Sequence, residues 1–366
     1  MQLKGTFIPI IVVVIILQSI IFSPYSVMAK NSMKTLDYNK LTISNTMDTN
    51  EKTVQNTTFS IVVTQSFLAD FVQNIVGDLF KVTSIVTGTE DPHSFSPKPS
   101  DITTINAANV FVVFGVEDID GWAEPIISSP PPTLHVLTLV NLTEDGTFDP
   151  FIGSTGALNP HLWMSPIFVN NTLIQRIYDG LVQIDPTHQE IYSTNLISYR
   201  TKLGGLIERV QANATKLSGL EVIEYHAAFF YLLRDMNITR LGTIEQIEDQ
   251  EPSALHIVQI TQKINQELDK GKEIILIQPM NLANSTTWQL ARDTGIKISY
   301  MTALMGTYPS IAFTSYIQMI DYDLIALNNP SEAPNALTPG FEIFTVIIPL
   351  ILLAGVFYIK FSKKDV

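Results

Sequence analysis

Three histidines in this chain stand where a metal ion could be bound. His93 ends an Asp-Pro-His tripeptide, and His161 ends a similar Asn-Pro-His tripeptide further along the chain. His226 follows an apolar run that is typical of a β-strand. Neutral imidazole is the commonest protein ligand for zinc and related cations. Because the chain has only six histidines in 366 residues, these three are candidate metal ligands.

Strand and helix patterns alternate around these histidines. Apolar, β-branched runs predict two sets of four strands, at 59–65, 80–87, 109–115 and 133–139, and at 220–225, 239–244, 273–278 and 297–302. Helical patterns separate them, at 67–79, from 99 onward, at 118–128, 227–236, 252–270 and 282–294. Strands that alternate with helices in this way predict an α/β fold with two lobes, each built on a parallel sheet.

A long helix is predicted between the two lobes, over residues 186–213. Apolar residues recur there at intervals of four and three, on one face of the helix: Tyr192, Leu196, Tyr199, Leu203, Leu206 and Val210. At 1.5 Å per residue this helix would be about 42 Å long. It could therefore run along both lobes as a stiff connection, weakened locally by the pair Gly204 and Gly205.

The candidate ligands fall at the ends of predicted strands. His93 lies just after the second strand of the first lobe, and His161 lies in the segment that leaves its last strand. In the second lobe, His226 ends the first strand and Thr302 ends the fourth. Ligands gather at the carboxyl ends of parallel strands. These four residues are therefore expected to converge on the cleft between the lobes.

Both ends of the chain predict an extracytoplasmic protein. Lys4 precedes an apolar run at 7–22, and small residues follow up to Ala29, which is the pattern of an export signal or an N-terminal anchor. A second apolar run at 341–359, followed by lysines, is long enough to cross a bilayer with its basic end in the cytoplasm. We therefore expect the chain to lie at the cell surface, tethered to the membrane by its tail.

Composition excludes several classes of site and partner. The 35 acidic and 22 basic residues give a net charge of −13, which disfavours nucleic acid as a partner. The chain contains no cysteine, so disulfides, thiolate metal sites and a lipid-modified cysteine anchor are excluded.

The resulting division of the chain has seven parts. These are a signal peptide or anchor (1–29), a polar spacer (30–57), an N-terminal metal-binding lobe (58–165), a helical linker (166–216), a C-terminal metal-binding lobe (217–328), a second spacer (329–340) and a transmembrane or sorting tail (341–366).

Four sequence motifs resemble those of a known family. Asp-Pro-His-Ser-Phe-Ser-Pro-Lys-Pro-Ser-Asp at 91–101 and Asn-Pro-His-Leu-Trp-Met-Ser-Pro at 159–166 look like two motifs of the zinc and manganese solute-binding proteins of ABC transporters. Tyr-His-Ala-Ala-Phe at 225–229 resembles a third motif, and Glu-Pro-Ser at 251–253 matches the helix start that follows it. The resemblance extends from about 58 to 328. The tail also resembles the sorting tails of archaeal surface proteins.

This resemblance implies two (β/α)4 lobes joined by one rigid helix, with a bare divalent cation bound between them. His93, His161 and His226 match three ligand positions of the family. The family's fourth ligand is usually an aspartate, which is replaced here by Thr302, so Thr302 or a water is expected in its place. Gln278 also replaces a frequent glutamate. Three imidazoles with few carboxylates favour Zn²⁺, with Mn²⁺ second.

The leading hypothesis is a monomeric binding protein that captures this ion outside the cell and delivers it to an ABC permease. It would not be an enzyme. One alternative is a zinc hydrolase, because three histidines and a water also describe a catalytic zinc. That alternative needs a general base, for which Glu90 and Glu224 are the nearest candidates in the sequence. The other alternative is a tethered surface sensor or adhesin without a role in transport.

Overall fold

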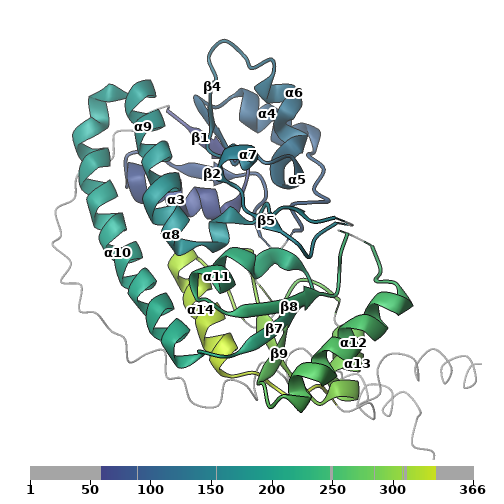
Figure 1. Ribbon diagram of the computed structural model, residues 1–366. Coiled ribbons are helices and arrows are strands. Elements are labelled where there is room, and N and C mark those ends of the chain that lie inside the picture. The colour runs from purple at the N-terminus through teal and green to yellow at the C-terminus, as the bar shows by residue number, and fades with distance from the viewer. Residues whose placement is uncertain are drawn as a thin grey trace, which may run out of the picture.

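The computed structural model describes residues 59–334, except 89, 154, 248–249, 284, 307 and 309–310. The expected export signal, the first spacer and the C-terminal tail lie outside these residues. Within them, no helix is both long and apolar enough to span a membrane. Figure 1 shows two parallel sheets, one above the other, with long helices running along one side of both.

The N-terminal lobe contains β1 (Ile61–Val63), β2 (Val82–Ser84), β3 (Val110–Val113) and β4 (His135–Thr138), in the order β2-β1-β3-β4. Its helices are α3 (Ser66–Val76), α4 (Pro99–Asn106), α5 (Glu117–Asp120) and α6 (Glu124–Ile127). The central strand β3 is buried along its whole length, as expected for a parallel strand covered on both faces. Strand β4 lies at the edge of the sheet, and His135 is exposed there.

The C-terminal lobe repeats this plan. It contains β7 (Glu221–Glu224), β8 (Thr239–Thr243), β9 (Ile274–Pro279) and β10 (Lys297–Met301), in the order β10-β9-β7-β8, with α11 (Phe230–Asp235), α12 (Ala254–Asp269) and α13 (Ser285–Thr294) between them. Ser253 caps the N-terminus of α12, and its side chain accepts a hydrogen bond from the amide of His256. All eight predicted strands are thus present in parallel sheets, which confirms the predicted fold class.

The segment between the lobes is mostly helical. It contains α7 (Leu142–Asp145), a small antiparallel pair formed by β5 (Phe148–Asp149) and β6 (Ala157–Leu158), then α8 (Pro166–Phe168), the π-helical turn η4 (Val169–Leu173), α9 (Ile174–Ile184) and α10 (Gln189–Lys216). Helix α10 has 28 residues and buries the six apolar residues that the sequence pattern selected. It continues through Gly204 and Gly205 without a break.

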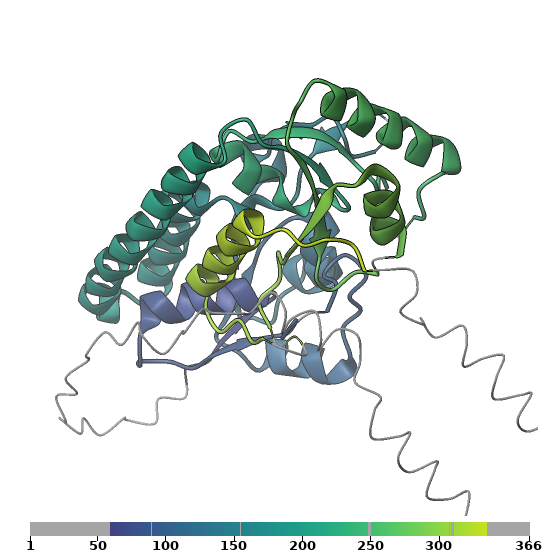
Figure 2. The same cartoon turned by 90° about the horizontal axis from the view of Figure 1, so that it is seen from below.

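Helix α14 (Tyr316–Asn328), which the sequence analysis did not predict, packs beside α10 (Figures 1 and 2). Together with α3 it helps to form one apolar core that includes residues of both lobes. The lobes are also joined by hydrogen bonds: Trp163 Nε1 donates to the carbonyl of Ala303 (2.8 Å), and the Tyr316 hydroxyl donates to the carbonyl of Trp163 (2.7 Å). A shared core of this kind restricts how far the lobes can separate.

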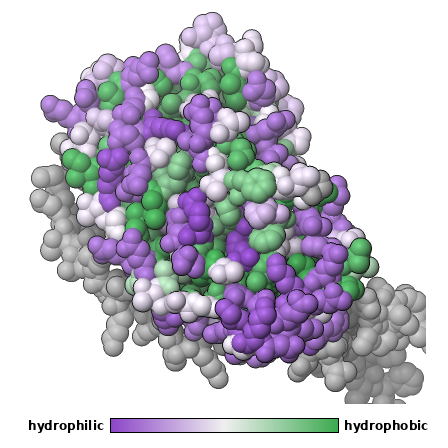
Figure 3. Space-filling model, in the orientation of Figure 1, coloured by the Kyte–Doolittle hydropathy of each residue, from purple (hydrophilic) through white to green (hydrophobic). Residues whose placement is uncertain are grey.

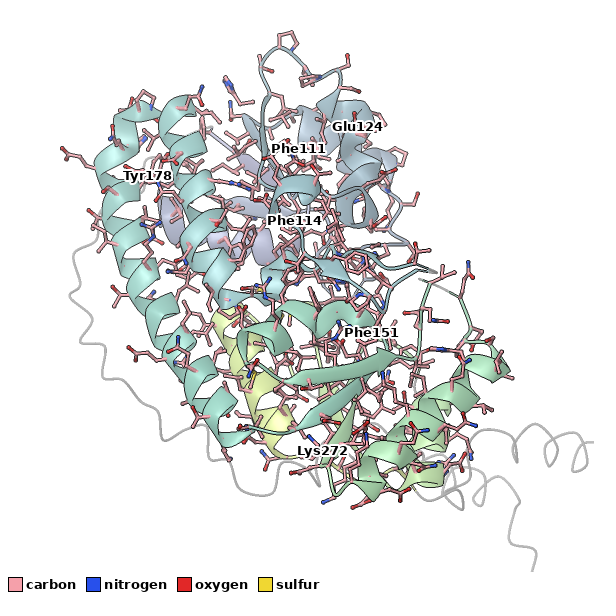
Figure 4. All side chains as sticks on the ribbon, in the orientation of Figure 1. Phe111, Phe114, Glu124, Phe151, Tyr178 and Lys272 are labelled. Carbon is pink, nitrogen blue, oxygen red and sulfur yellow. The ribbon has the colours of Figure 1, made fainter. Side chains whose placement is uncertain are left out.

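Hydrophilic and hydrophobic side chains are mixed over the face shown in Figure 3, with the densest hydrophilic area at the lower end of the C-terminal lobe. Lys272 lies at that end, whereas Phe151 lies where the two lobes meet (Figure 4).

Candidate metal centre

A small cavity lies between the lobes, at the carboxyl ends of their strands. Its walls combine the three candidate histidines with two carboxylates and mostly apolar side chains: Asp91, Pro92, His93, His161, Trp163, His226, Ala228, Glu245, Pro279, Asn281, Leu282, Ala303 and Leu304. The enclosed space is about 30 Å³. Because one water needs at least about 10–15 Å³ on this measure, the cavity has room for an ion and little else.

The three imidazoles point their Nε2 atoms at one another. His161 is central, since its Nε2 lies 3.2 Å from Nε2 of His93 and 3.2 Å from Nε2 of His226. Within the described residues, this is the group of metal-binding side chains whose ligand atoms all lie within 4.8 Å of one another. Tetrahedral zinc with Zn–N bonds of about 2.0–2.1 Å separates its ligands by about 3.3 Å. The observed distances are therefore close to those of a zinc site.

Asn159 fixes the orientation of His161. Its Oδ1 accepts hydrogen bonds from the backbone amide of His161 (2.9 Å) and from the ring Nδ1 (3.1 Å). Its Nδ2 donates to Asp149 (3.0 Å) and to the carbonyl of Ala227 (2.8 Å), so Oδ1 is the acceptor. The ring proton of neutral His161 must then be on Nδ1, and Nε2 presents a lone pair to the cavity.

Burial and the neighbouring histidines keep His161 in this neutral form. The side chain is almost fully enclosed, and desolvation lowers the pKa of His161 well below its ordinary value. His226 and His93 lower this pKa further, because a positive charge on one imidazole disfavours a second one nearby. A neutral imidazole is the form that binds a metal ion.

His93 and His226 are held by the chain segments that follow their strands. His93 lies in the loop after β2, where its backbone amide donates to Asp91 Oδ1 (3.0 Å). His226 comes two residues after the end of β7 and precedes the short helix η6 (Ala227–Phe229). The Nδ1 of His226 lies 2.6 Å from Oε2 of Glu245. Each lobe thus supplies at least one candidate ligand from a strand end.

A buried ion cluster lies next to the site. Arg240 binds Asp149 through Nη1 (2.9 Å) and Glu224 through Nε, and both carboxylates are fully enclosed. The guanidinium also lies over the rings of Phe151 and Phe230, at 5.3 and 4.9 Å from their centroids. Since Asp149 also accepts from Asn159, this cluster connects the C-terminal lobe to the residue that orients His161.

The family profile described as "ZnuA: Zinc-uptake complex component A periplasmic" matches residues 61–329. The chain belongs to this family. ZnuA-type proteins are components of metal-uptake systems, not enzymes. The match covers both lobes and the connecting helices, which agrees with the resemblance seen in the sequence motifs.

Individual relatives in the ZnuA family carry names that refer to different metals. The chain is 25% identical to the high-affinity zinc uptake system protein ZnuA of Bacillus subtilis, over 67% of this chain and 78% of the relative. It is 27% identical to the manganese-binding lipoprotein MntA of Halalkalibacterium halodurans (72% and 85%) and 24% identical to the iron-binding protein YfeA of Yersinia pestis (72% and 83%). Membership of the family therefore indicates a divalent metal without selecting one.

Solved structures of the ZnuA type share the fold. A zinc-bound deletion mutant of ZnuA superposes with a TM-score of 0.62 at 22% identity, covering 76% of this chain and all of that one. The laminin-binding protein Lmb of Streptococcus agalactiae superposes with a TM-score of 0.61 at 22% identity, covering 74% and 98%. At this level of identity, the likeness establishes the two-lobed fold alone.

Thr302, the expected fourth ligand, does not join the three histidines. It is fully buried, and its hydroxyl is engaged by the Tyr308 hydroxyl and by the carbonyl of Leu304 (2.9 Å). The next two residues line the cavity, but Thr302 itself does not. The Thr302 side chain thus satisfies its hydrogen bonds inside the lobe, and the other expected occupant of the fourth position, a water, stays a prediction.

Sequence reasoning missed Glu245, the carboxylate that contacts His226. The signal was available, because Glu245 follows the end of β8 just as the histidines follow other strands. Two acidic or amide residues that the sequence analysis did consider lie elsewhere: Glu224 binds Arg240 in the buried cluster, and Gln278 accepts from Thr287 within the C-terminal lobe. Neither lines the cavity.

Proposed function

We propose that this protein captures a divalent cation, Zn²⁺ in preference to Mn²⁺, outside the cytoplasm and delivers it to an ABC permease. The observation that carries the proposal is the convergence of three imidazole Nε2 atoms in a cavity of about 30 Å³. A cavity of this size favours a bare ion over an organic solute or a chelate.

Binding on this proposal is an exchange of ligands. The Nε2 atoms of His93, His161 and His226 replace waters on the cation, and a remaining position is left for water because Thr302 does not reach it. Asn159 holds His161 ready before the ion arrives, which reduces the ordering that binding requires. Docking on the permease would then loosen the cavity and release the ion.

The preference for zinc follows from the donor set. Three nitrogen ligands suit zinc, whereas manganese favours oxygen-rich octahedral sites. Of the two carboxylates in the cavity wall, Asp91 accepts from the backbone amide of His93 and Glu245 contacts Nδ1 of His226. These two carboxylates are fewer than an oxygen-rich octahedral site requires.

The wider arrangement is also proposed. Residues 1–29 would direct export, and the tail at 341–366 would tether a monomer to the membrane, with 58–165 and 217–328 as the two metal-binding lobes and 166–216 as the linker. The hydrolase alternative is not retained, because the family consists of uptake components and Glu224 lies outside the cavity.

Metal analysis of the purified protein, followed by competitive titration with Zn²⁺ and Mn²⁺, tests this function. Wild-type protein should bind one Zn²⁺ more tightly than Mn²⁺. His161→Ala should weaken zinc binding by at least ~100-fold, because loss of a ligand should exceed the 10–100-fold effect of losing a supporting partner. His135→Ala, which removes an exposed imidazole on an edge strand, is the matched control. An unchanged affinity in His161→Ala would refute the site.

A further inference from the structure

We propose that Glu245 is the positioning residue for the metal ligand His226 and a source of negative charge for the bound cation. This inference rests on the proposed function of the cavity. On this proposal Glu245 acts through the ring of His226 and is not itself a ligand of the ion.

The backbone places Glu245 beside His226. The parallel pairing of β7 and β8 continues past the end of β8, since the amide of Ile244 donates to the carbonyl of Glu224 (2.8 Å) and the amide of Glu245 donates to the carbonyl of Tyr225 (2.8 Å). These bonds hold Glu245 next to the segment that carries His226. The contact between the two side chains is thus built on paired strand ends and not on a free loop.

The contact also decides which ring nitrogen of His226 faces the cavity with a lone pair. A carboxylate only accepts hydrogen bonds, so Nδ1 of His226 must carry a proton where it meets Glu245 at 2.6 Å. In the neutral ring this leaves the lone pair on Nε2. Asn159 imposes the same state on His161.

When both rings are neutral, two lone pairs face each other across 3.2 Å. This arrangement is repulsive unless a positive charge lies between the nitrogens, and either a shared proton or a bound metal ion supplies that charge. Glu245 and Asn159 thus hold two imidazoles in a state that favours a cation between them.

The negative charge of Glu245 also compensates part of the positive charge of the cation. The three imidazoles are neutral ligands, and apart from Asp91 and Asn281 the other side chains of the cavity wall are apolar. The side chain of Glu245 is only 11% exposed, so water screens its charge weakly. The nearby guanidinium of Arg240 is already matched by two carboxylates. Glu245 therefore stabilises a divalent ion in the cavity through the ring of His226.

The experiment compares Glu245→Gln, Glu245→Ala and Glu273→Gln by competitive zinc titration. Glutamine keeps an acceptor for Nδ1 but removes the charge, so we expect zinc affinity to fall about 10-fold; alanine removes both, and we expect about 100-fold. Glu273→Gln makes the same change in net charge on an exposed side chain just before β9, beside Lys272 at the far end of the lobe (Figure 4). It should bind zinc as the wild type does.

Two further measurements separate positioning from other roles. The unfolding free energy of metal-free Glu245→Gln should stay within about 1 kcal/mol of the wild type, because the replacement preserves shape and acceptor. The absorption bands of the Co²⁺-loaded variant should keep their positions, because the ligand set is unchanged. Shifted bands would identify Glu245 as a direct ligand and overturn the positioning role.

The outcomes also distinguish a failure of the proposed zinc-binding function from a failure of the role of Glu245. A wild-type protein that does not bind zinc contradicts the proposed function. A wild-type protein that binds zinc, with Glu245→Ala binding as tightly as Glu273→Gln, overturns the role of Glu245 alone.

Discussion

Replacement of Arg240 by methionine tests how the buried ion cluster supports the lobes. Arg240 is the cation between Asp149 and Glu224, and its side chain is 6% exposed while both carboxylates are fully enclosed. Methionine fills much of the same space between Phe151 and Phe230 but carries no charge. Arg240→Met therefore leaves two buried carboxylates without the guanidinium that neutralises them.

The expected loss follows from this burial. Removing one partner of a buried ion pair costs about 3–5 kcal/mol, because the remaining charge keeps its desolvation penalty. Burial raises the pKa of Glu224, and Arg240 is the main group that opposes this effect, so Arg240→Met leaves the burial of Glu224 largely uncompensated. We expect Arg240→Met to lower the unfolding free energy by about 3–5 kcal/mol, a large part of the 5–15 kcal/mol typical of a domain.

A second substitution should restore part of that loss. In Arg240→Met/Glu224→Gln only Asp149 keeps an unmatched charge, so the double variant should be more stable than Arg240→Met alone. Urea unfolding of metal-free protein, followed by circular dichroism and linear extrapolation, measures both differences. Equal m-values across the set are needed for a direct comparison of free energies.

Two results would refute this reasoning. If Arg240→Met loses less than about 1 kcal/mol of unfolding free energy, the carboxylates do not depend on the guanidinium. The ion pairs would then contribute as little as solvated surface pairs do. If the double variant is less stable than Arg240→Met, the loss comes from packing or from lost hydrogen bonds and not from stranded charge.

Two further predictions concern stability without metal. Burial raises the pKa of Asp323 well above its ordinary value, so the folded protein holds a proton there that the unfolded chain releases above about pH 4. The unfolding free energy of the wild type, relative to that of Asp323→Asn, should therefore fall by about 1.4 kcal/mol per pH unit until Asp323 ionises in the folded protein. Urea unfolding measures this difference, and the same value at pH 5 and pH 6 would contradict the prediction. Gly115 and Gly271 both have positive φ (92° and 76°), but a Cβ would lie 2.8 Å from the Val140 carbonyl oxygen at Gly115 and meet nothing within 4 Å at Gly271. Thermal or urea unfolding should therefore show Gly115→Ala less stable than Gly271→Ala by about 1–3 kcal/mol, and equal losses would count against the contact.

Much of the fold could be predicted from the sequence because its signals are local. Apolar β-branched runs predict the strands, and the alternating spacing of four and three residues from Tyr192 to Val210 predicts the buried face of α10. Helix α14 was missed although its buried residues, from Tyr316 to Leu327, recur at helical spacing, because further apolar residues such as Ile317 and Tyr322 obscure this pattern. The helix packs against α10 and β10. Local pattern carries no information about which distant surfaces will cover such a segment.

The sequence by itself determined the residue types and their placement at strand ends, and these were sufficient to identify His93, His161 and His226 as candidate ligands. Only the tertiary structure decided which side chains share the cavity. It turned the Thr302 hydroxyl toward Tyr308 and placed Glu245 against His226. The physical reason is that a hydrogen-bonding side chain takes the partner that folding brings within about 3 Å, and that partner can come from any part of the chain.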